Sequence, residues 1–101
     1  MILTSKDMYA IVFDLDIEKL KTHYPNDSYK NAYTSIQKEF ESFGFVRQQN
    51  SVYYGDRENV TIVDCVLVVQ SLSRKYDWFK PSIKDIRMLR IVDNDDLFKV
   101  L

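Results

Sequence analysis

The stretch MYAIVFDLD, residues 8–16, decides how this chain of 101 residues folds. Seven of its nine residues are apolar, and Ile11, Val12 and Phe13 belong to the types that favour β-strands. Side chains of a strand alternate between its two faces, so a strand covered on one face only would alternate apolar with polar residues. This stretch stays apolar until Asp14. It therefore predicts a strand that is buried on both faces, and each face requires a cover.

The length and composition of the chain indicate a single globular domain. A chain of 101 residues has room for one core of two layers, and its 46% hydrophobic residues exceed what disordered chains carry. Its 14 basic and 15 acidic residues nearly cancel, so any surface for nucleic acid has to be local. We find no signal-peptide pattern, no apolar run approaching the roughly 18 residues of a membrane span, and one cysteine, Cys65, among valines. We expect a cytoplasmic protein with no membrane partner and a buried thiol.

Two helices follow from the spacing of apolar residues. Between Ser28, a predicted N-cap, and Gly44, a predicted C-terminal stop, apolar residues recur every three or four positions. The segment over residues 59–74 is rich in valine, but its polar residues fall on one helical face, which predicts a second helix. Those polar residues are Thr61, Asp64, Ser71 and Lys75. Residues 16–27 are expected to form a polar loop that holds one helical turn.

Three further strands complete the predicted sheet. Residues 45–48 and 51–54 indicate a hairpin, and residues 85–93 indicate a last strand. The order strand, helix, strand, strand, helix, strand predicts an α+β, ferredoxin-like βαββαβ fold, with a four-stranded antiparallel sheet and two helices on one face. The first and last strands are apolar on both faces, so the other face of the sheet needs a cover. A second copy of the chain would supply it, in a homodimer paired through its sheets.

Most enzyme mechanisms need residues that this chain lacks. His23 is the only histidine, no Cys or His spacing matches a zinc site, and two glycines are too few for a phosphate-binding loop. The string FDLD, residues 13–16, is similar to the haloacid-dehalogenase-like phosphotransferase motif, but Ile17 and Glu18 stand where that motif has Gly-Thr. Asp14, at the carboxyl end of the buried strand, is then either a functional acid or a cap that bonds loop amides.

A local cluster of basic residues accompanies the last strand. It consists of Lys80, Lys84, Arg87 and Arg90. These bases either contact RNA phosphates or form internal salt bridges at a solvated edge, and Asp85 shares a strand face with Arg87. Four aromatic residues are open to two interpretations as well, base stacking or core packing. They are Tyr53, Tyr54, Trp78 and Phe79.

Five strings together carry a family resemblance. They are MYAIVFDL (8–15), NAYTSI (31–36), GFVRQQNSVYYGD (44–56), WF (78–79) and SIKDIRMLRIVD (82–93). In these strings the chain resembles the virulence-associated protein D (VapD) family, small bacterial endoribonucleases that are toxins or toxin-like and similar in fold to the CRISPR-associated adaptation nucleases. The resemblance begins at Met8 and covers almost the whole chain. We therefore expect one VapD-like domain over residues 1–101, with residues 1–7 as an N-terminal extension.

The resemblance implies a homodimer that cleaves single-stranded RNA at the aspartate of the first strand, which is Asp14 here. The family's site also includes positions that match Leu20, Ser51 and Asp85. Asn50 stands where the family usually has glycine before that serine, and asparagine tolerates a left-handed backbone. An antitoxin protein is the implied partner of a toxin-like member.

These residues suggest a mechanism at the seam of the dimer. Asp14 shares a strand face with Ala10 and Val12, so we expect Asp14 of each protomer to lie near that seam. It either holds Mg²⁺ or another divalent cation that activates water, or acts without metal as the base on the ribose 2′-hydroxyl. The predicted catalytic residues are Asp14, Ser51 and Asp85, and the predicted substrate contacts are Leu20, Lys84 and Arg87. The rival interpretation is a non-catalytic dimeric module that binds RNA or protein.

Overall fold

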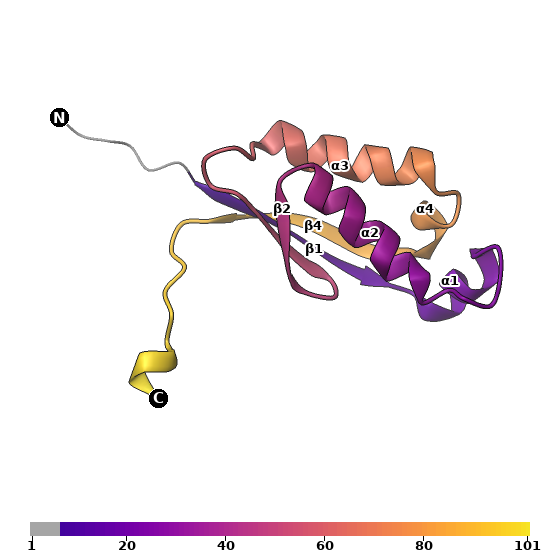
Figure 1. Ribbon diagram of the computed structural model, residues 1–101, viewed down its shortest axis with the longest axis horizontal. Coiled ribbons are helices and arrows are strands. Elements are labelled where there is room, and N and C mark those ends of the chain that lie inside the picture. Colours follow the sequence, from indigo (N-terminus) through magenta and orange to yellow (C-terminus); the bar gives the residue numbers. More distant parts are fainter. Residues whose placement is uncertain (1–6) are drawn as a thin grey trace.

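The computed structural model describes residues 7–101 as one antiparallel sheet with helices over one of its faces (Figure 1). In chain order the elements are β1 (Met8–Leu15), α1 (Ile17–His23), α2 (Asn31–Ser42), β2 (Phe45–Gln49), β3 (Val52–Gly55), α3 (Ile62–Lys75), α4 (Phe79–Ser82), β4 (Ile83–Ile91) and the 3₁₀ turn η1 (Phe98–Val100). The strands lie in the order β2-β3-β1-β4, and each neighbouring pair is antiparallel. This arrangement confirms the predicted α+β, ferredoxin-like fold. Six residues of the expected extension, 1–6, lie outside the described residues.

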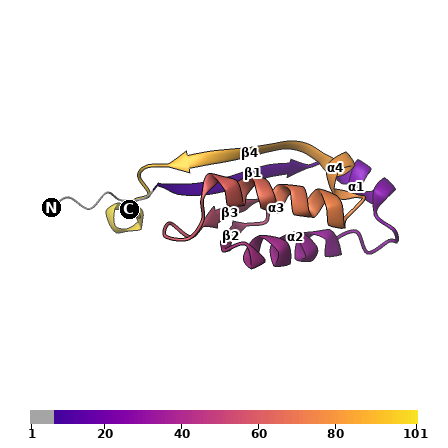
Figure 2. The same cartoon turned by 90° about the horizontal axis from the view of Figure 1, so that it is seen from above.

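The two long helices form the second layer of the molecule. Helices α2 and α3 run across the same face of the sheet, and the short helices α1 and α4 lie together at the end where β1 stops and β4 begins (Figures 1 and 2). The sequence predicts only one helical turn after β1, whereas α1 spans seven residues. Across residues 7–101, none of the helices has the length and hydropathy that a membrane crossing requires.

β1 is the centre of both the sheet and the core. It pairs with β3 on one side and β4 on the other, as its apolar sequence predicts. Ile11, Phe13 and Leu15 are buried in the core that the helices cover. The ring of Phe13 stacks near Phe40 of α2 and Tyr53 of β3, with centroids 6.2 Å from each. Burying a side chain of this size contributes roughly 1.5–3 kcal/mol, so Phe13 stabilises the core directly.

The second acid of FDLD begins a helix. The Oδ1 atom of Asp16 accepts a hydrogen bond from the backbone N–H of Lys19 at 3.1 Å, which makes Asp16 the N-cap of α1. The backbone N–H of Asp16 donates to the carbonyl oxygen of Ser82 at 2.8 Å and so holds α1 against α4. The haloacid-dehalogenase-like interpretation is wrong on two counts, because that fold needs a parallel, doubly wound sheet and a second acid that is free for chemistry.

The two ends of α2 differ in how well the sequence marks them. The prediction of Ser28 as a side-chain N-cap is wrong, since α2 follows Lys30 with no capping side chain and Ser28 offers only its carbonyl oxygen to the N–H of Asn31. A tight turn across residues 28–31 therefore delays the start of the helix. The C-terminal stop is confirmed: Gly44 has a φ of +89°, a backbone conformation that glycine adopts without a Cβ clash.

Helix α3 is confirmed, but two of the polar residues that predicted it face another helix and not water. It begins at Ile62, after a capping box in which Thr61 and Asp64 bond each other's backbone N–H groups. Its buried residues are Cys65, Val68 and Leu72, and its exposed apolar residues are Ile62, Val63, Val66 and Leu67. The polar residues Ser71 and Lys75 face helix α2, where a buried carboxylate requires hydrogen-bond donors.

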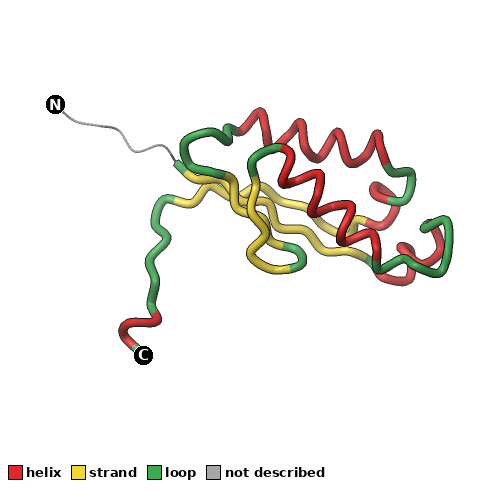
Figure 3. The backbone as a smooth tube through the Cα atoms, in the orientation of Figure 1, coloured by secondary structure: helices red, strands yellow, loops and turns green. Residues whose placement is uncertain are grey.

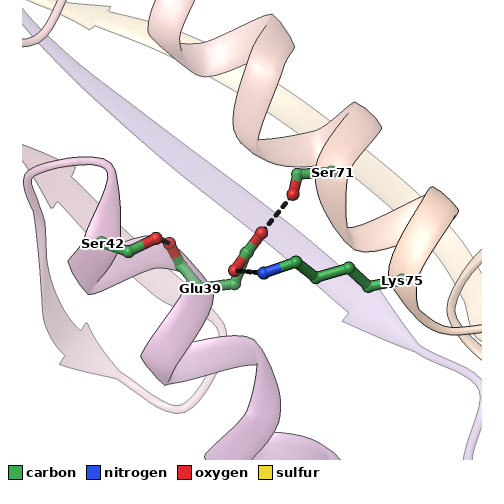
Figure 4. Close-up of polar contacts among 4 residues, drawn as sticks. All are labelled: Glu39, Ser42, Ser71 and Lys75. Atoms are coloured by element: carbon green, nitrogen blue, oxygen red, sulfur yellow. Dashed lines mark hydrogen bonds and ion pairs between the residues drawn. The ribbon is translucent and has the colours of Figure 1, made fainter.

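That carboxylate belongs to Glu39, which joins α2 to α3 (Figure 4). The residue is only 6% exposed; Lys75 Nζ donates to its Oε1 atom at 2.8 Å, and Ser71 Oγ donates to Oε2. Its carbonyl oxygen accepts a further hydrogen bond from Ser42 Oγ at 2.7 Å. Burial alone would raise the pKa of Glu39, but the hydrogen bonds from Lys75 and Ser71 outweigh burial and hold that pKa below its ordinary value.

We predict that Glu39→Gln lowers the free energy of unfolding by about 1–2 kcal/mol at neutral pH, because the amide loses the charge-assisted hydrogen bonds. The pKa of Glu39 is lower in the folded chain than in the unfolded one. Its contribution is therefore complete above the ordinary carboxyl pKa and disappears as the pH falls through the folded value. Urea unfolding of both proteins at several pH values should show the difference shrinking in acid. Glu41→Gln, an exposed position on the same helix, is the matched control, and a difference that persists unchanged in acid contradicts the assignment.

Candidate functional site

The sheet face turned away from α2 and α3 carries the site residues. None of the helices α1 to α4 covers this face, which we call the open face (Figure 1). Residues that are partners in register point to the same side of a sheet. On the open face the pairs between β1 and β4 are Met8 with Ile91, Ala10 with Leu89, Val12 with Arg87, and Asp14 with Asp85. The face is therefore apolar along most of β1 and charged where β1 ends.

The charged end brings two acids together. Asp14 and Asp85 are direct partners in register, and partners in antiparallel strands have Cβ atoms about 4.5–5.5 Å apart. Two like charges in this position destabilise the sheet. The side chain of Asp14 is exposed and makes no hydrogen bond or ion pair with another side chain in the described part of the chain. It is therefore not the cap that the alternative interpretation supposed, and its carboxylate is available to a substrate.

Arg87 compensates part of this negative charge. Its Nε atom lies 3.2 Å and 3.1 Å from the two carboxylate oxygens of Asp85, and both side chains are more than half exposed. Arg90 contacts Asp7 at 3.6 Å. In the single chain these two arginines thus form the internal salt bridges that were one of the two predicted alternatives. Exposed ion pairs are weak, so Arg87 can exchange Asp85 for a phosphate. Lys84 is exposed and precedes Asp85 directly in the chain.

Ser51 lies near Asp14 through the backbone of β1. The sequence predicts that Ser51 opens the second hairpin strand, but it lies in the turn before β3, and its carbonyl oxygen accepts a hydrogen bond from Phe13 N–H at 3.0 Å. Its neighbour Asn50 accepts a hydrogen bond from Arg47 Nη2 at 2.6 Å. Asn50 does not adopt the left-handed backbone expected of it, since Gly44 alone has a positive φ among residues 7–101.

Leu20 occupies a different environment from the other predicted site residues. Its side chain is fully buried in the core, and it anchors α1 directly after the end of β1. Contact between Leu20 and the substrate stays a prediction. In this structure Leu20 packs into the core and does not lie on the surface. Three of the four aromatic residues named above are core as well: Tyr53, Trp78 and Phe79. Tyr54 is the register partner of Ala10 and lies half-buried on the open face.

Tyr33 is a neighbour of the site that the sequence did not reveal. It lies in the first turn of α2, and its helical spacing suggests only a core residue. Burial raises the pKa of the Tyr33 hydroxyl, and the negative charge of Asp14 raises it further, so the two groups lie within electrostatic reach of each other. No sequence pattern could have identified this influence, because it depends on how α2 lies relative to the end of β1.

The arrangement can hold an acid, a base or a cation next to a phosphate. Residues 7–101 contain no cluster of three His, Cys, Asp or Glu side chains that could enclose a metal ion. The pair of Asp14 and Asp85 instead offers two carboxylates, which suffice for Mg²⁺ when substrate oxygens complete its coordination. Beside them Arg87 offers a planar guanidinium, a group suited to phosphate.

Comparisons with curated proteins identify close relatives. The chain is 46% identical over 94 residues to endoribonuclease VapD 2 of Riemerella anatipestifer, covering 93% of this chain and 99% of the relative. It is 43% identical to an endoribonuclease VapD homolog of Helicobacter pylori and 42% identical to endoribonuclease VapD of Dichelobacter nodosus; both matches cover 93% of this chain and 96% and 97% of the relatives. No family model matches the sequence. Identity of this level along nearly the full length of each relative shows that the chain belongs to the VapD family.

Proposed function

We propose that this protein is an endoribonuclease that cleaves single-stranded RNA at a site centred on Asp14. The observation that carries the proposal is the cross-strand pair of Asp14 and Asp85 at the charged end of the open face. Two acids opposite each other destabilise a sheet, and residues that reduce stability in this way are typical of functional sites. The VapD relatives, all named endoribonucleases, support RNA as the substrate. Its place of action would be the cytoplasm, where RNA is available.

In the proposed reaction Asp14 accepts the proton of the attacking oxygen. If the 2′-hydroxyl of the ribose attacks, a bond forms between that oxygen and phosphorus and the bond to the 5′-oxygen breaks. The departing 5′-oxygen then takes a proton from water, and a cyclic phosphate remains. Arg87 would leave Asp85 and neutralise the charge that develops on the phosphate, with help from Lys84, while Ser51 would donate a hydrogen bond to a phosphate oxygen.

A divalent cation also fits this site. Mg²⁺ is commonly held by one or two carboxylates together with substrate phosphate oxygens, and Asp14 and Asp85 would be those carboxylates. When bound, the ion would supply an activated water and neutralise phosphate charge, and the product would carry a 3′-hydroxyl. The ends of the product therefore distinguish the two routes.

We further propose that two copies pair through their open faces. Leu89 is 47% exposed and Val46 is 60% exposed, while the half-buried Val12 and Tyr54 extend the same apolar surface. Apolar surface of this kind on a sheet is typical of an interface between subunits. The pairing would bring Asp14 of both protomers to the seam. An antitoxin protein would control such a toxin-like enzyme.

The first prediction from the proposed function concerns Asp14 itself. We expect Asp14→Asn to lower the rate of RNA cleavage about 10²–10⁴-fold, because the amide can neither accept a proton nor bind a cation. Cleavage of a labelled single-stranded RNA, with Mg²⁺ and with chelator, measures the rate and the product ends. Asp27→Asn, at an exposed acid in the loop before α2, should leave the rate unchanged. Unchanged cleavage by Asp14→Asn would contradict the assignment of Asp14 as the catalytic acid. No cleavage by the wild type would favour the non-catalytic module that binds RNA or protein.

A second prediction separates substrate binding from proton transfer. Arg87→Ala should weaken RNA binding and reduce the slope of log affinity against log salt by about 1, since one phosphate contact is lost. Fluorescence anisotropy over a range of salt concentrations measures that slope. Arg74→Ala, an exposed arginine on α3, is the control. An identical slope for the Arg87 variant and wild type means that Arg87 touches no phosphate.

A third prediction tests the dimer. Leu89→Lys places a charge in the apolar part of the open face and should shift the protein from dimer to monomer in light scattering. Ile17→Lys, on α1 at 36% exposure, should remain dimeric. A wild type that is monomeric at every concentration, or a Leu89→Lys protein that stays dimeric, contradicts pairing through this face.

A further inference from the structure

A second apolar surface lies on the opposite side of the sheet from the open face. Between α3 and the edge strand β4 there is a groove of about 290 Å³, which we call the α3 groove. Apolar residues form most of its lining, and the guanidinium-bearing Arg87 borders it as well. The apolar residues are Ile11, Cys65, Val66, Val69, Ile86 and Met88. Gln70 lies at its rim. The groove adjoins the exposed apolar residues of α3, and together they form an uncovered hydrophobic surface.

The segment after β4, residues 92–101, is a third exposed apolar element, which we call the arm. It leaves the sheet on the side away from the helices and ends in the turn η1 (Figures 1 and 3). Four of its residues are apolar and 68–96% exposed: Leu97, Phe98, Val100 and Leu101. Its first half is acidic, with Asp93, Asp95 and Asp96. An arm of this composition gains stability only when another surface covers it.

We propose that the arm of one protomer seats in the α3 groove of a second copy of this chain. The inference rests on the homodimer proposed above and not on its ribonuclease activity. It accounts for two exposed apolar surfaces with one contact. In a two-fold dimer the exchange is reciprocal, so both grooves and both arms are covered.

The charges of the two surfaces are complementary. Arg90 shares a strand face with Met88 and Ile86, and it therefore extends the wall of the α3 groove toward the end of β4. Its side chain is 63% exposed and contacts only Asp7, at 3.6 Å, among the residues described. The acidic half of an incoming arm would meet this arginine, while the apolar half would enter the groove.

The direction and length of the arm favour the second copy over its own groove. The arm projects to the side of the open face, whereas the groove lies on the helix side of the sheet (Figure 1). To reach its own groove, the arm would have to reverse around the end of β4. Packed sheets lie about 10 Å apart, and ten residues span up to about 35 Å when extended. The arm is therefore long enough to cross to a second copy that is paired through the open face. It can then pass the edge of that copy's sheet and reach the α3 groove.

Disulfide trapping between two differently labelled chains tests the proposal. All chains carry Cys65→Ala, which removes the buried thiol whose pKa burial raises to about 11. One chain then carries Gln70→Cys at the rim of the groove, and the other carries Lys99→Cys in the arm. After mild oxidation of the mixture we expect at least about tenfold more mixed disulfide than from the control pair, in which Gln48→Cys on the far edge strand β2 replaces Gln70→Cys.

Two further chains separate the remaining outcomes. A chain with both Gln70→Cys and Lys99→Cys should cross-link between chains, and an intrachain disulfide at high dilution without mixed disulfide overturns the exchange. Adding Phe98→Asp to the arm chain should abolish the mixed disulfide, and its persistence shows that the apolar arm does not direct the contact. Failure to trap any disulfide also overturns the proposal. RNA cleavage by the reduced chains is measured separately, so cleavage without trapping leaves the proposed ribonuclease standing.

Discussion

The whole structure depends on the central position of β1 in the sheet. Because β1 lies between β3 and β4, it is paired on both edges, and its side chains must be covered on both faces. The helices cover one face through the stack of Phe13 with Phe40 and Tyr53. The other face remains open in the single chain. The same strand thus builds the core and leaves an apolar surface that demands a partner.

The acids at the end of β1 show how one short string serves two purposes. Asp16 has a local structural role: its side chain caps the start of α1, and its backbone N–H holds α1 near α4. Asp14, two residues earlier, points to the open face, where the pairing with β4 sets Asp85 opposite it. A local cap and a candidate catalytic acid therefore follow from the same alternation of side chains along one strand. The weak, exposed pair of Asp85 and Arg87 leaves this end of the sheet responsive to a phosphate.

The polar residues of the helices have a different role. Glu39 is buried between α2 and α3 and receives donors from Ser71 and Lys75, which fixes how the two helices lie against each other. With those polar residues turned inward, α3 is left with valine, isoleucine and leucine on its outside. The rotation of α3 about its own axis therefore has two effects. It turns Ser71 and Lys75 toward the buried Glu39, and it leaves apolar residues of α3 exposed. The open face, the α3 groove and the arm are then three hydrophobic surfaces on one small domain.

Local patterns in the sequence determined the types of the elements. The apolar run of β1, the stop at Gly44 and the hairpin after it depend on neighbours in the chain, so they predicted the βαββαβ order and put Asp14 on the face of Ala10 and Val12. Only the tertiary structure decided that Asp85 lies opposite Asp14, that Leu20 is buried, that Ser51 belongs to a turn, and that the charge of Asp14 raises the pKa of Tyr33. Strand register and helix rotation are set by contacts between residues far apart in the chain, and hydrophobic periodicity does not encode those contacts.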